Sequence, residues 1–518
     1  MSKYALIFIV ICFFACGGVK EKQVQEQPKP IPNPVIKGEF PDPSVIEVDG
    51  TYYACGTSND WAPIYPIYSS KDLENWTFES YVFSEKPEWT MSGFWAPELF
   101  YHNGTFYCYY TAKRKNGVSC IGVATTKDIS KGFEDHGILI EWGSESIDAF
   151  VFDDGGELYV TWKAYGLNPD KPIQILGSGL SKDGLELKGE VFEVVTAEAD
   201  TWERGGIEGQ SMVKNDDYYY LLYSGAACCG GGCDYKVGVA RAKSVTGPWE
   251  KYTGNPILSD FGDWKCPGHG TPIEDESGDW YYLYHAYAKE GFPYLGRSGL
   301  INRFYWDEES GWPYFKVNEL IDESSGHVQP VDFEDDFGAN ELAPQWRWDL
   351  ASYSPEVEIE KGVLKLSGKG SLSNNGLGAV LNVVPENANY EIKVTLNIQQ
   401  GVFKGLVLYG THENMIGLGL QEKNLTLFEI REGNYQELGA VKTEIDDEAT
   451  LRAVVSDGHQ VSFSYQSNSG EWMKIVPEGN KGAVLKGDYL SFWQWGVKPG
   501  IFVKGGQKGE FKAFDLTY

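Results

Sequence analysis

Short runs in which aromatic and polar residues alternate recur five times in the first three fifths of the chain. Each run follows a turn signal, and alternation with a period of two predicts a β-strand. The runs are "DGTYYACGTS" (49–58), "NGTFYCYYTA" (103–112), "GGELYVTWKA" (155–164), "DDYYYLLYSG" (216–225) and "SGDWYYLYHA" (277–286). No helical periodicity lies between them. The pattern therefore predicts repeated units of short antiparallel strands.

The repeats keep a nearly constant spacing, which indicates the architecture. One anchor tyrosine marks each run, at Tyr53, Tyr107, Tyr159, Tyr220 and Tyr281, with gaps of 54, 52, 61 and 61 residues. About four strands in each unit of this length are typical of a β-propeller blade. We therefore predict a five-bladed β-propeller over residues 35–330.

The pattern changes near residue 331, where a second domain is expected. Residues 331–518 alternate apolar and polar positions in short strands such as "GVLKLSG", "YEIKVTLNI" and "QVSFSYQ". This profile predicts an antiparallel β-sandwich. The predicted fold class is all-β, a five-bladed propeller followed by a sandwich.

Charged side chains stand at one offset within the propeller repeats. Eleven or twelve residues before the anchor tyrosines lie Asp42, the "WAPE" run (95–98), Asp148, Glu208 and His269. Equivalent positions of successive blades surround the central axis, so these side chains should converge. Carboxylates brought together in this way cost stability and shift one another's pKa values, which is typical of functional sites. Glu98, at a slightly different offset, is interpreted as structural.

The first residues read as a targeting segment. "MSKYALIFIVICFFAC" has a lysine, an apolar run too short to span a membrane, and then Cys16. We interpret residues 1–15 as a lipoprotein signal peptide with Cys16 as the lipid attachment site; an ordinary secretory signal with an incidental cysteine is the alternative. Residues 16–34 are polar and proline-rich, as in a linker. The protein is expected to be an exported bacterial lipoprotein of the periplasm or outer membrane, held to the membrane only by that anchor.

Charge narrows the class of partner. The 518 residues include 44 Lys and Arg against 74 Asp and Glu, a formal net charge of −30. Nucleic acid is excluded as a partner, because phosphate binding needs clustered basic residues. A neutral sugar is compatible with this charge, and aromatic residues at 14% suit both strand packing and sugar stacking.

Seven of the nine cysteines lie outside the signal, and three of them form the motif "CCGGGC" (Cys228, Cys229, Cys233). A zinc site with Cys266 and His269 would need a spacing that is absent here. In an exported protein a local disulfide that closes the glycine-rich loop is the preferred prediction.

Six motifs carry a resemblance to a known family. They are "PDPSVI" (41–46), "FWAPELFYHNGTFY" (94–107), "SIDAFVF" (146–152), "GIEGQSMVK" (206–214), "PGHGTPI" (267–273) and "LGRSGLINRFYW" (295–306). In this order the chain resembles glycoside hydrolase family 43, five-bladed propeller enzymes that remove arabinose, xylose and related sugars from plant polysaccharides. The second domain resembles the concanavalin-like sandwich attached to many of its exo-acting members.

The resemblance implies roles for individual residues. Asp42 would be the general base, Glu208 the general acid, and Asp148 the group that tunes the pKa of the acid and helps to hold it. Trp95 would line the sugar pocket and Arg297 would bind sugar hydroxyls.

Two interpretations of His269 stay open. The resemblance places this residue near a structural calcium ion in the central channel, and a neutral, hydrogen-bonded core histidine is the alternative. No organic cofactor is expected.

The predicted function is that of an exo-acting, inverting glycosidase. It would release α-L-arabinofuranose or β-xylose from plant cell-wall polysaccharides or oligosaccharides. Two alternatives remain: a fructosidase-type five-bladed hydrolase, and a non-catalytic glycan-binding lipoprotein. The first normally carries Arg-Asp-Pro and Glu-Cys signatures, which this sequence lacks.

Overall fold

The computed structural model describes residues 31–518 except 168–169, 321–327, 352–353, 370–376, 479–481, 492 and 494. The predicted signal peptide, Cys16 and most of the linker lie outside the described residues. Among these described residues, strands make up nearly all of the regular structure, with one short 3₁₀ helix, η1 (Ile129–Lys131), and one short helix, α1 (Val317–Leu320). In the part of the chain so described, no helix is long and apolar enough to cross a membrane.

The strands of the first domain pair into five successive antiparallel units of four, as the repeats predict. Unit 1 contains β1 (Ser44–Val48), β2 (Thr51–Cys55), β4 (Ile64–Ser70) and β5 (Trp76–Phe83). Unit 2 contains β6 (Thr90–His102), β7 (Thr105–Arg114), β8 (Ser119–Thr126) and β9 (Glu134–Ile140). Unit 3 contains β10 (Glu145–Asp154), β11 (Glu157–Tyr165), β12 (Gln174–Leu180) and β13 (Leu187–Thr196). One parallel residue pair, Glu145 with Ser119, joins units 2 and 3.

Units 4 and 5 complete the propeller. Unit 4 contains β14 (Ile207–Asn215), β15 (Tyr218–Gly225), β16 (Lys236–Ala242) and β17 (Glu250–Lys251). Unit 5 contains β18 (Trp264–Glu274), β19 (Trp280–Ala288), β20 (Arg297–Trp306) and β21 (Pro313–Tyr314). The first strands of the units contact one another in the cyclic order β1, β6, β10, β14, β18 and back to β1. They are therefore the innermost strands, and apolar residues of the neighbouring strands fill the spaces between units.

The second domain is a sandwich of two antiparallel sheets around one large apolar core. The nine-stranded sheet contains β22 (Phe333–Asp335), β24 (Ser354–Ile359), β25 (Leu364–Lys369), β27 (Tyr390–Asn397), β32 (Glu448–Ser456), β33 (Gln460–Gln466), β34 (Trp472–Ile475), β35 (Val484–Lys486) and β37 (Gly509–Thr517). The six-stranded sheet contains β26 (Ala379–Asn382), β28 (Lys404–Thr411), β29 (Asn414–Gln421), β30 (Asn424–Arg431), β31 (Asn434–Lys442) and β36 (Lys498–Val503). Strand β27 alternates strictly between buried and half-buried residues, as its sequence predicts.

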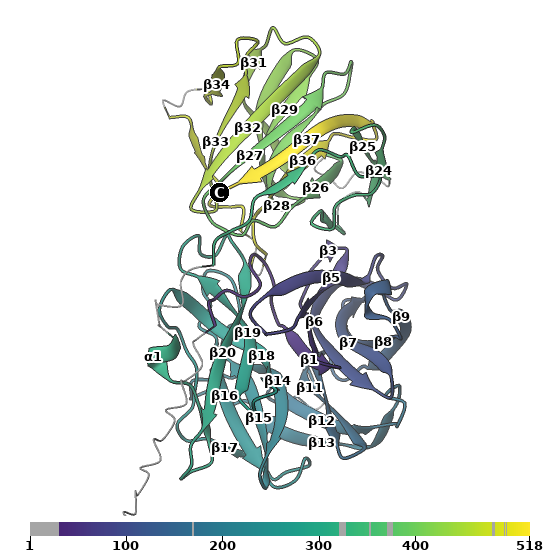
Figure 1. The fold of residues 1–518 in the computed structure, drawn as a ribbon, viewed down its shortest axis with the longest axis vertical. Coiled ribbons are helices and arrows are strands. Elements are labelled where there is room, and N and C mark those ends of the chain that lie inside the picture. Colours follow the sequence, from purple (N-terminus) through teal and green to yellow (C-terminus); the bar gives the residue numbers. More distant parts are fainter. Residues whose placement is uncertain are drawn as a thin grey trace, which may run out of the picture.

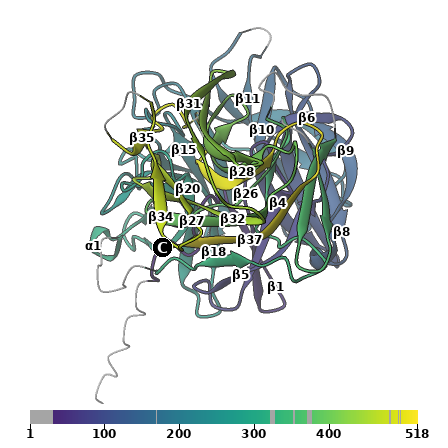
Figure 2. The same cartoon turned by 90° about the horizontal axis from the view of Figure 1, so that it is seen from above.

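The sandwich sits on one end of the propeller, as Figure 1 shows in side view and Figure 2 from above. A short strand of the propeller, β3 (Trp61–Ala62), pairs with β23 (Trp348–Asp349) at the start of the second domain. The buried Trp61 ring packs edge-on against Tyr409 and Trp495 of the sandwich, with 5.6 Å between ring centroids in both pairs. The two domains therefore share an apolar interface.

A buried ion pair accompanies this apolar interface. The ammonium group of Lys498 on β36 contacts the carboxylate of Glu39, and their side chains are only 2% and 6% exposed. The same carboxylate accepts a hydrogen bond of 3.0 Å from the backbone N–H of Gly496. Glu39 lies three residues before Asp42, so the sandwich is tied to the segment that carries the proposed base.

Candidate active site

The innermost strands share a backbone irregularity at the positions predicted to converge. At or next to the predicted position in each unit, one residue has a positive φ: Asp42 (52°), Ala96 (39°), Asp148 (58°), Gly209 (59°) and His269 (39°). In β6, β10, β14 and β18 the strand register slips around this residue, and Asp42 lies just before β1. Such bulges re-aim a side chain, and left-handed backbone at non-glycine residues clusters at functional sites. We call these five residues the inner positions.

In unit 4 the left-handed residue is Gly209, and the predicted acid, Glu208, precedes it by one residue. A Cβ atom on Gly209 would lie 2.7 Å from Cγ of His269. Glycine is therefore required there by both its φ angle and the close approach of the imidazole.

A second set of polar residues holds the inner positions, and it stands four residues after each anchor tyrosine. These support positions are Thr57, Thr111, Lys163, Ser224 and His285. Each one bonds to the next unit around the ring: Thr57 to the N–H of Ala96, Thr111 to that of Asp148, Ser224 to that of His269, and His285 to that of Asp42. Lys163 is different, because it bonds to the Glu208 side chain. The five bonds close the ring unit by unit.

Asp42 lies in a strongly cationic and hydrogen-bonding environment. Its Oδ1 accepts a hydrogen bond of 3.0 Å from Nη1 of Arg297, and its Oδ2 accepts one of 2.8 Å from the Thr57 hydroxyl. Burial by itself raises the pKa of Asp42, but the guanidinium of Arg297 and the contacts with His285 and His269 together outweigh burial, and the pKa lies well below its usual range. Burial lowers the pKa of His285 to about 4, so this imidazole is neutral at neutral pH. Asp42 is therefore an ionised carboxylate.

Asp148 and Glu208 form a coupled pair. The N–H of Gly209 donates a hydrogen bond of 2.9 Å to Asp148 Oδ2, and burial together with the Glu208 charge raises the pKa of Asp148 well above its usual range. Burial also favours a neutral Glu208, but Lys163, 2.9 Å from Glu208 Oε2, lowers the Glu208 pKa. The hydroxyl of Tyr235 donates a bond of 3.1 Å to Glu208 Oε1. One proton shared by these two carboxyls rests on Asp148 in the free protein.

The two predicted sugar-binding residues flank this ring. Arg297, on β20, is 1% exposed, and its Nε and Nη2 atoms have no hydrogen-bond partner among the described residues. Buried donors without partners fit a site that awaits hydroxyl groups. Trp95 is half-buried on β6; Nζ of Lys113 lies 4.6 Å above its ring, and Trp493 of the sandwich packs edge-on at 6.2 Å.

His269 lies between the two aspartates. Its Nδ1 is 3.7 Å from both Asp42 Oδ1 and Asp148 Oδ2, and burial lowers its pKa. Calcium prefers six to eight oxygen ligands, and the described part of the chain has no group of three His, Cys, Asp or Glu side chains arranged to hold a metal. These side chains do not fit a calcium ion coordinated directly by the protein. A hydrated ion that touches only His269 stays a prediction.

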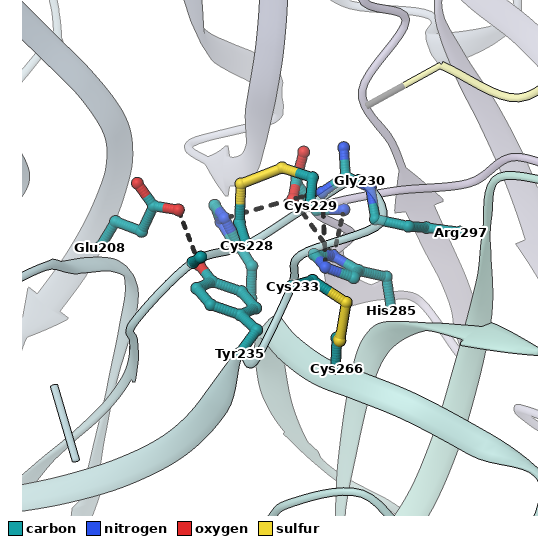
Figure 3. Close-up of a disulfide and its surroundings, with 12 residues drawn as sticks. Glu208, Cys228, Cys229, Gly230, Cys233, Tyr235, Cys266, His285 and Arg297 are labelled. Atoms are coloured by element: carbon teal, nitrogen blue, oxygen red, sulfur yellow. Dashed lines mark hydrogen bonds and ion pairs between the residues drawn. A yellow bond between two sulfur atoms is a disulfide. The ribbon is translucent and has the colours of Figure 1, made fainter. Parts of the chain in front are cut away.

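The cysteine-rich motif forms two disulfides. Cys228 is bonded to its neighbour Cys229, and Cys233 is bonded to Cys266 on the strand of His269 (Figure 3). The prediction of a local disulfide that closes the glycine-rich loop is therefore wrong: the first pair joins adjacent residues and encloses none of the three glycines, and the second spans 33 residues and ties the loop to unit 5. The three described cysteines outside these pairs, Cys55, Cys108 and Cys120, are buried.

Several site residues had escaped the sequence reasoning. The support positions could have been found, because a polar residue follows each anchor tyrosine at the same distance within a mostly apolar strand. Tyr235 and Trp493 had no such signal. The first lies beside a loop whose path is set by disulfides, and the second comes from the other domain.

Glu98, on β6, is buried. It is 5% exposed; the Ser44 hydroxyl donates a bond of 2.6 Å to Oε2, and the Val151 N–H donates one of 3.4 Å to Oε1. Burial raises its pKa to about 8. The side chain is therefore a neutral acid at neutral pH, in keeping with the structural interpretation.

Glu98→Gln is expected to stabilise the protein above about pH 5. As the pH rises from the unfolded-state pKa of about 4.5 towards 8, the unfolded chain loses this proton while the folded chain keeps it, so the wild type loses stability. The variant has no such proton and does not share this loss. Thermal melts at pH 5 and pH 8 should show the gap in Tm between variant and wild type widening by several degrees. The exposed Glu134→Gln is the control; an equal change there would contradict the prediction.

Comparison with known proteins identifies relatives of both domains. Residues 31–313 match the family "Glycosyl hydrolases family 43", and residues 334–517 match "Beta xylosidase C-terminal Concanavalin A-like domain". A "Xylan 1,3-beta-xylosidase" of Vibrio sp is 27% identical over 56% of this chain. This match spans 58% of the Vibrio protein's own length. A "Non-reducing end alpha-L-arabinofuranosidase" of Bacteroides ovatus is 25% identical over 76% of either chain.

A solved structure shares the whole arrangement. The "xylan beta-1,4-xylosidase" of Bacillus halodurans C-125 superposes with a TM-score of 0.77 over 94% of this chain and 100% of its own, at 23% identity. That likeness shows the fold, a propeller followed by a sandwich. The resemblance carried by the six sequence motifs is confirmed by the family match over more than half of the residues. The chain belongs to glycoside hydrolase family 43.

Proposed function

We propose that this protein is an exo-acting, inverting glycosidase that releases α-L-arabinofuranose or β-xylose from plant polysaccharides or oligosaccharides. The observation that carries the proposal is the convergence of three carboxyl groups from three different units: Asp148 and Glu208 on innermost strands, and Asp42 just before the innermost strand β1. Family membership and the names of relatives that act on xylose and arabinose linkages support it. The fructosidase-type alternative gains no support from the family match.

The proposed reaction needs one carboxylate and one carboxylic acid. Asp42 takes a proton from a water molecule whose oxygen attacks the anomeric carbon. The bond to the leaving oxygen breaks, and Glu208 gives its proton to that oxygen. Asp42 suits the first role because Arg297 keeps it ionised, and the free donors of Arg297 suit sugar hydroxyls.

Glu208 can act as the acid only when the shared proton moves to it. Lys163 also contacts Glu145, at 2.9 Å, so it keeps an anionic partner when Glu208 becomes neutral. The basic limb of the pH–rate profile then reports loss of the proton shared by Asp148 and Glu208.

Lys163→Met and Asp148→Asn should move that basic limb in opposite directions. Removing the cation raises the pKa of Glu208, so the limb moves up by about 1–3 pH units. Removing the like charge of Asp148 lowers that pKa, and the limb moves down. Profiles of kcat/KM on a nitrophenyl pentoside measure both shifts, with Lys113→Met as a lysine control at the pocket edge. If the basic limbs of both variants fall at the same pH as that of the wild type, the proton is not shared by Asp148 and Glu208.

A panel of nitrophenyl glycosides on the purified protein tests the activity itself. Turnover of an α-L-arabinofuranoside or a β-xyloside is the expected result, and proton NMR of the first product should show the inverted anomer. Oligosaccharide binding without turnover of any glycoside would favour the non-catalytic alternative. Release of the retained anomer would overturn Asp42 as the base.

Export as a lipoprotein anchored through Cys16 is part of the proposal, and the signal-like sequence of residues 1–16 supports it. Cys16→Ala, expressed in a Gram-negative host, should move the protein from the membrane fraction to the soluble fraction. Mass spectrometry of the wild-type N-terminus should find lipid on Cys16. An unmodified Cys16 would leave the secretory-signal alternative.

A further inference from the structure

The Cys228–Cys229 disulfide lies beside the proposed acid. The loop that carries it, residues 226–235, joins β15 to β16 and begins directly after Gly225. Strand β15 pairs with β14 in this region, with Ser224 opposite Glu208. The loop therefore rises from the strand end next to the Glu208 side chain, and its last residue, Tyr235, bonds to that carboxylate.

The loop is held firmly from behind. Cys233 is linked to Cys266 on β18, and the N–H of Gly230 donates a bond of 3.1 Å to the Tyr287 hydroxyl. Cys229 is 7% exposed and packs in a small cluster with Tyr235 and Tyr287, whereas Cys228 is half-buried. Figure 3 shows the bond between the two sulfurs beside the Tyr235 ring, with Glu208 to one side and Arg297 to the other.

The sandwich also reaches this loop. A Cβ atom on Gly230 would lie 2.7 Å from the carbonyl oxygen of Trp493, and φ at Gly230 is 73°. Trp493, a residue that is 55% exposed, packs its ring against Trp95 of unit 2. Trp95, Trp493 and the disulfide loop therefore follow one another along one side of the site.

The side chains around Glu208 are polar, whereas the disulfide loop beside them offers an apolar surface. The inner and support positions around Glu208 supply carboxylates, two imidazoles and an ammonium group, and Arg297 adds a guanidinium, all suited to hydroxyls. A pentose also has an apolar C–H surface, and sugar-binding pockets combine a few polar groups with apolar walls. Two sulfur atoms and two Cβ atoms held together by adjacent residues give a compact surface without strong donors, and sulfur is soft and polarisable.

We propose that the Cys228–Cys229 disulfide is a wall of the sugar pocket, packed against the C–H face of the pentose whose glycosidic oxygen Glu208 protonates. It is a specificity-determining contact, since a bulkier or differently puckered ring would meet a rigid surface. The proposal rests on the proposed function for the identity of the ligand.

The test compares two paired variants with the wild type. C228A/C229A removes the sulfur wall, and C233A/C266A removes the anchor behind the loop. Binding of free L-arabinose and D-xylose is measured by calorimetry, and KM and kcat on the nitrophenyl pentoside are measured alongside. C228A/C229A should weaken pentose binding and raise KM about five- to tenfold, with kcat and its pH profile nearly unchanged. C233A/C266A should lower Tm and change pentose binding less.

Two results would overturn the proposal. One is a pentose affinity of C228A/C229A within twofold of the wild type, and the other is a larger loss of pentose affinity in C233A/C266A than in C228A/C229A. A measurement on the folded wild type does not depend on any variant. A saturating pentose should slow reduction of Cys228–Cys229 by a dithiol at least fivefold, as followed by alkylation and peptide mass spectrometry. Equal reduction rates with and without both sugars would also overturn the proposal. Protection without any glycoside turnover would refute the proposed hydrolase and leave this binding wall intact.

Discussion

The Glu208→Gln variant is expected to cleave pentose oligosaccharides about 100- to 10,000-fold more slowly than the wild type. An amide cannot give a proton to the leaving sugar oxygen, which is a poor leaving group without protonation. Nitrophenolate needs little protonation, so the variant should keep much more of its activity on nitrophenyl pentosides. The ratio of kcat/KM on the two substrate classes is the measurement. An equal loss on both classes would contradict the assignment of Glu208 as the acid.

Asp42→Asn is the comparison that separates the two roles. Water must be activated whichever group leaves, so this variant should be impaired on both substrate classes. It also leaves the buried guanidinium of Arg297 without its carboxylate, and a lower Tm is expected. Glu208→Gln leaves Lys163 with Glu145 and should melt close to the wild type. A large drop in Tm for Glu208→Gln would mean that the residue holds the ring together.

The second large effect is expected at the domain interface. Lys498→Met leaves the Glu39 carboxylate buried without its partner, and breaking a buried ion pair in this way costs about 3–5 kcal/mol. Calorimetry should show a lower and broader transition. Because Glu39 precedes Asp42 by three residues, and Phe40 donates a bond to the carbonyl of Arg297, kcat should fall as well.

Two further variants make this result specific. Glu39→Gln combined with Lys498→Met removes both charges and should recover most of the lost stability. Lys365→Met breaks the more exposed pair of Lys365 with Glu360 and should cost no more than about 1 kcal/mol. If Lys498→Met behaves like Lys365→Met, the buried pair does not hold the domains together.

The strand repeats were legible in the sequence because their period and polarity follow directly from blade geometry. The anchor tyrosines located three of the inner positions directly and the fourth, Ala96, within the "WAPE" run. Glu208 falls one residue before the bulge because Gly209 occupies it. Which of the two carboxyls holds the shared proton could not be predicted from the sequence. It depends on Lys163, which contacts Glu208 from the neighbouring unit. Cysteine pairing and the approach of Trp493 were also hidden, because both depend on how distant segments pack.

The ring of inner and support positions also bears on how such a catalyst can be changed. Four of the five inner positions lie in strand bulges, and most inner side chains contribute little to the apolar packing between units. A substitution there can therefore change the functional group at the site while the blades keep their structure. Ala96 illustrates this: it has the same left-handed backbone as Asp42 and Asp148 and carries only a methyl group. A directed-evolution library confined to Glu208 and to these positions other than Gly209, where glycine is required, would sample new acids, bases and sugar contacts around one axis, with the scaffold already built.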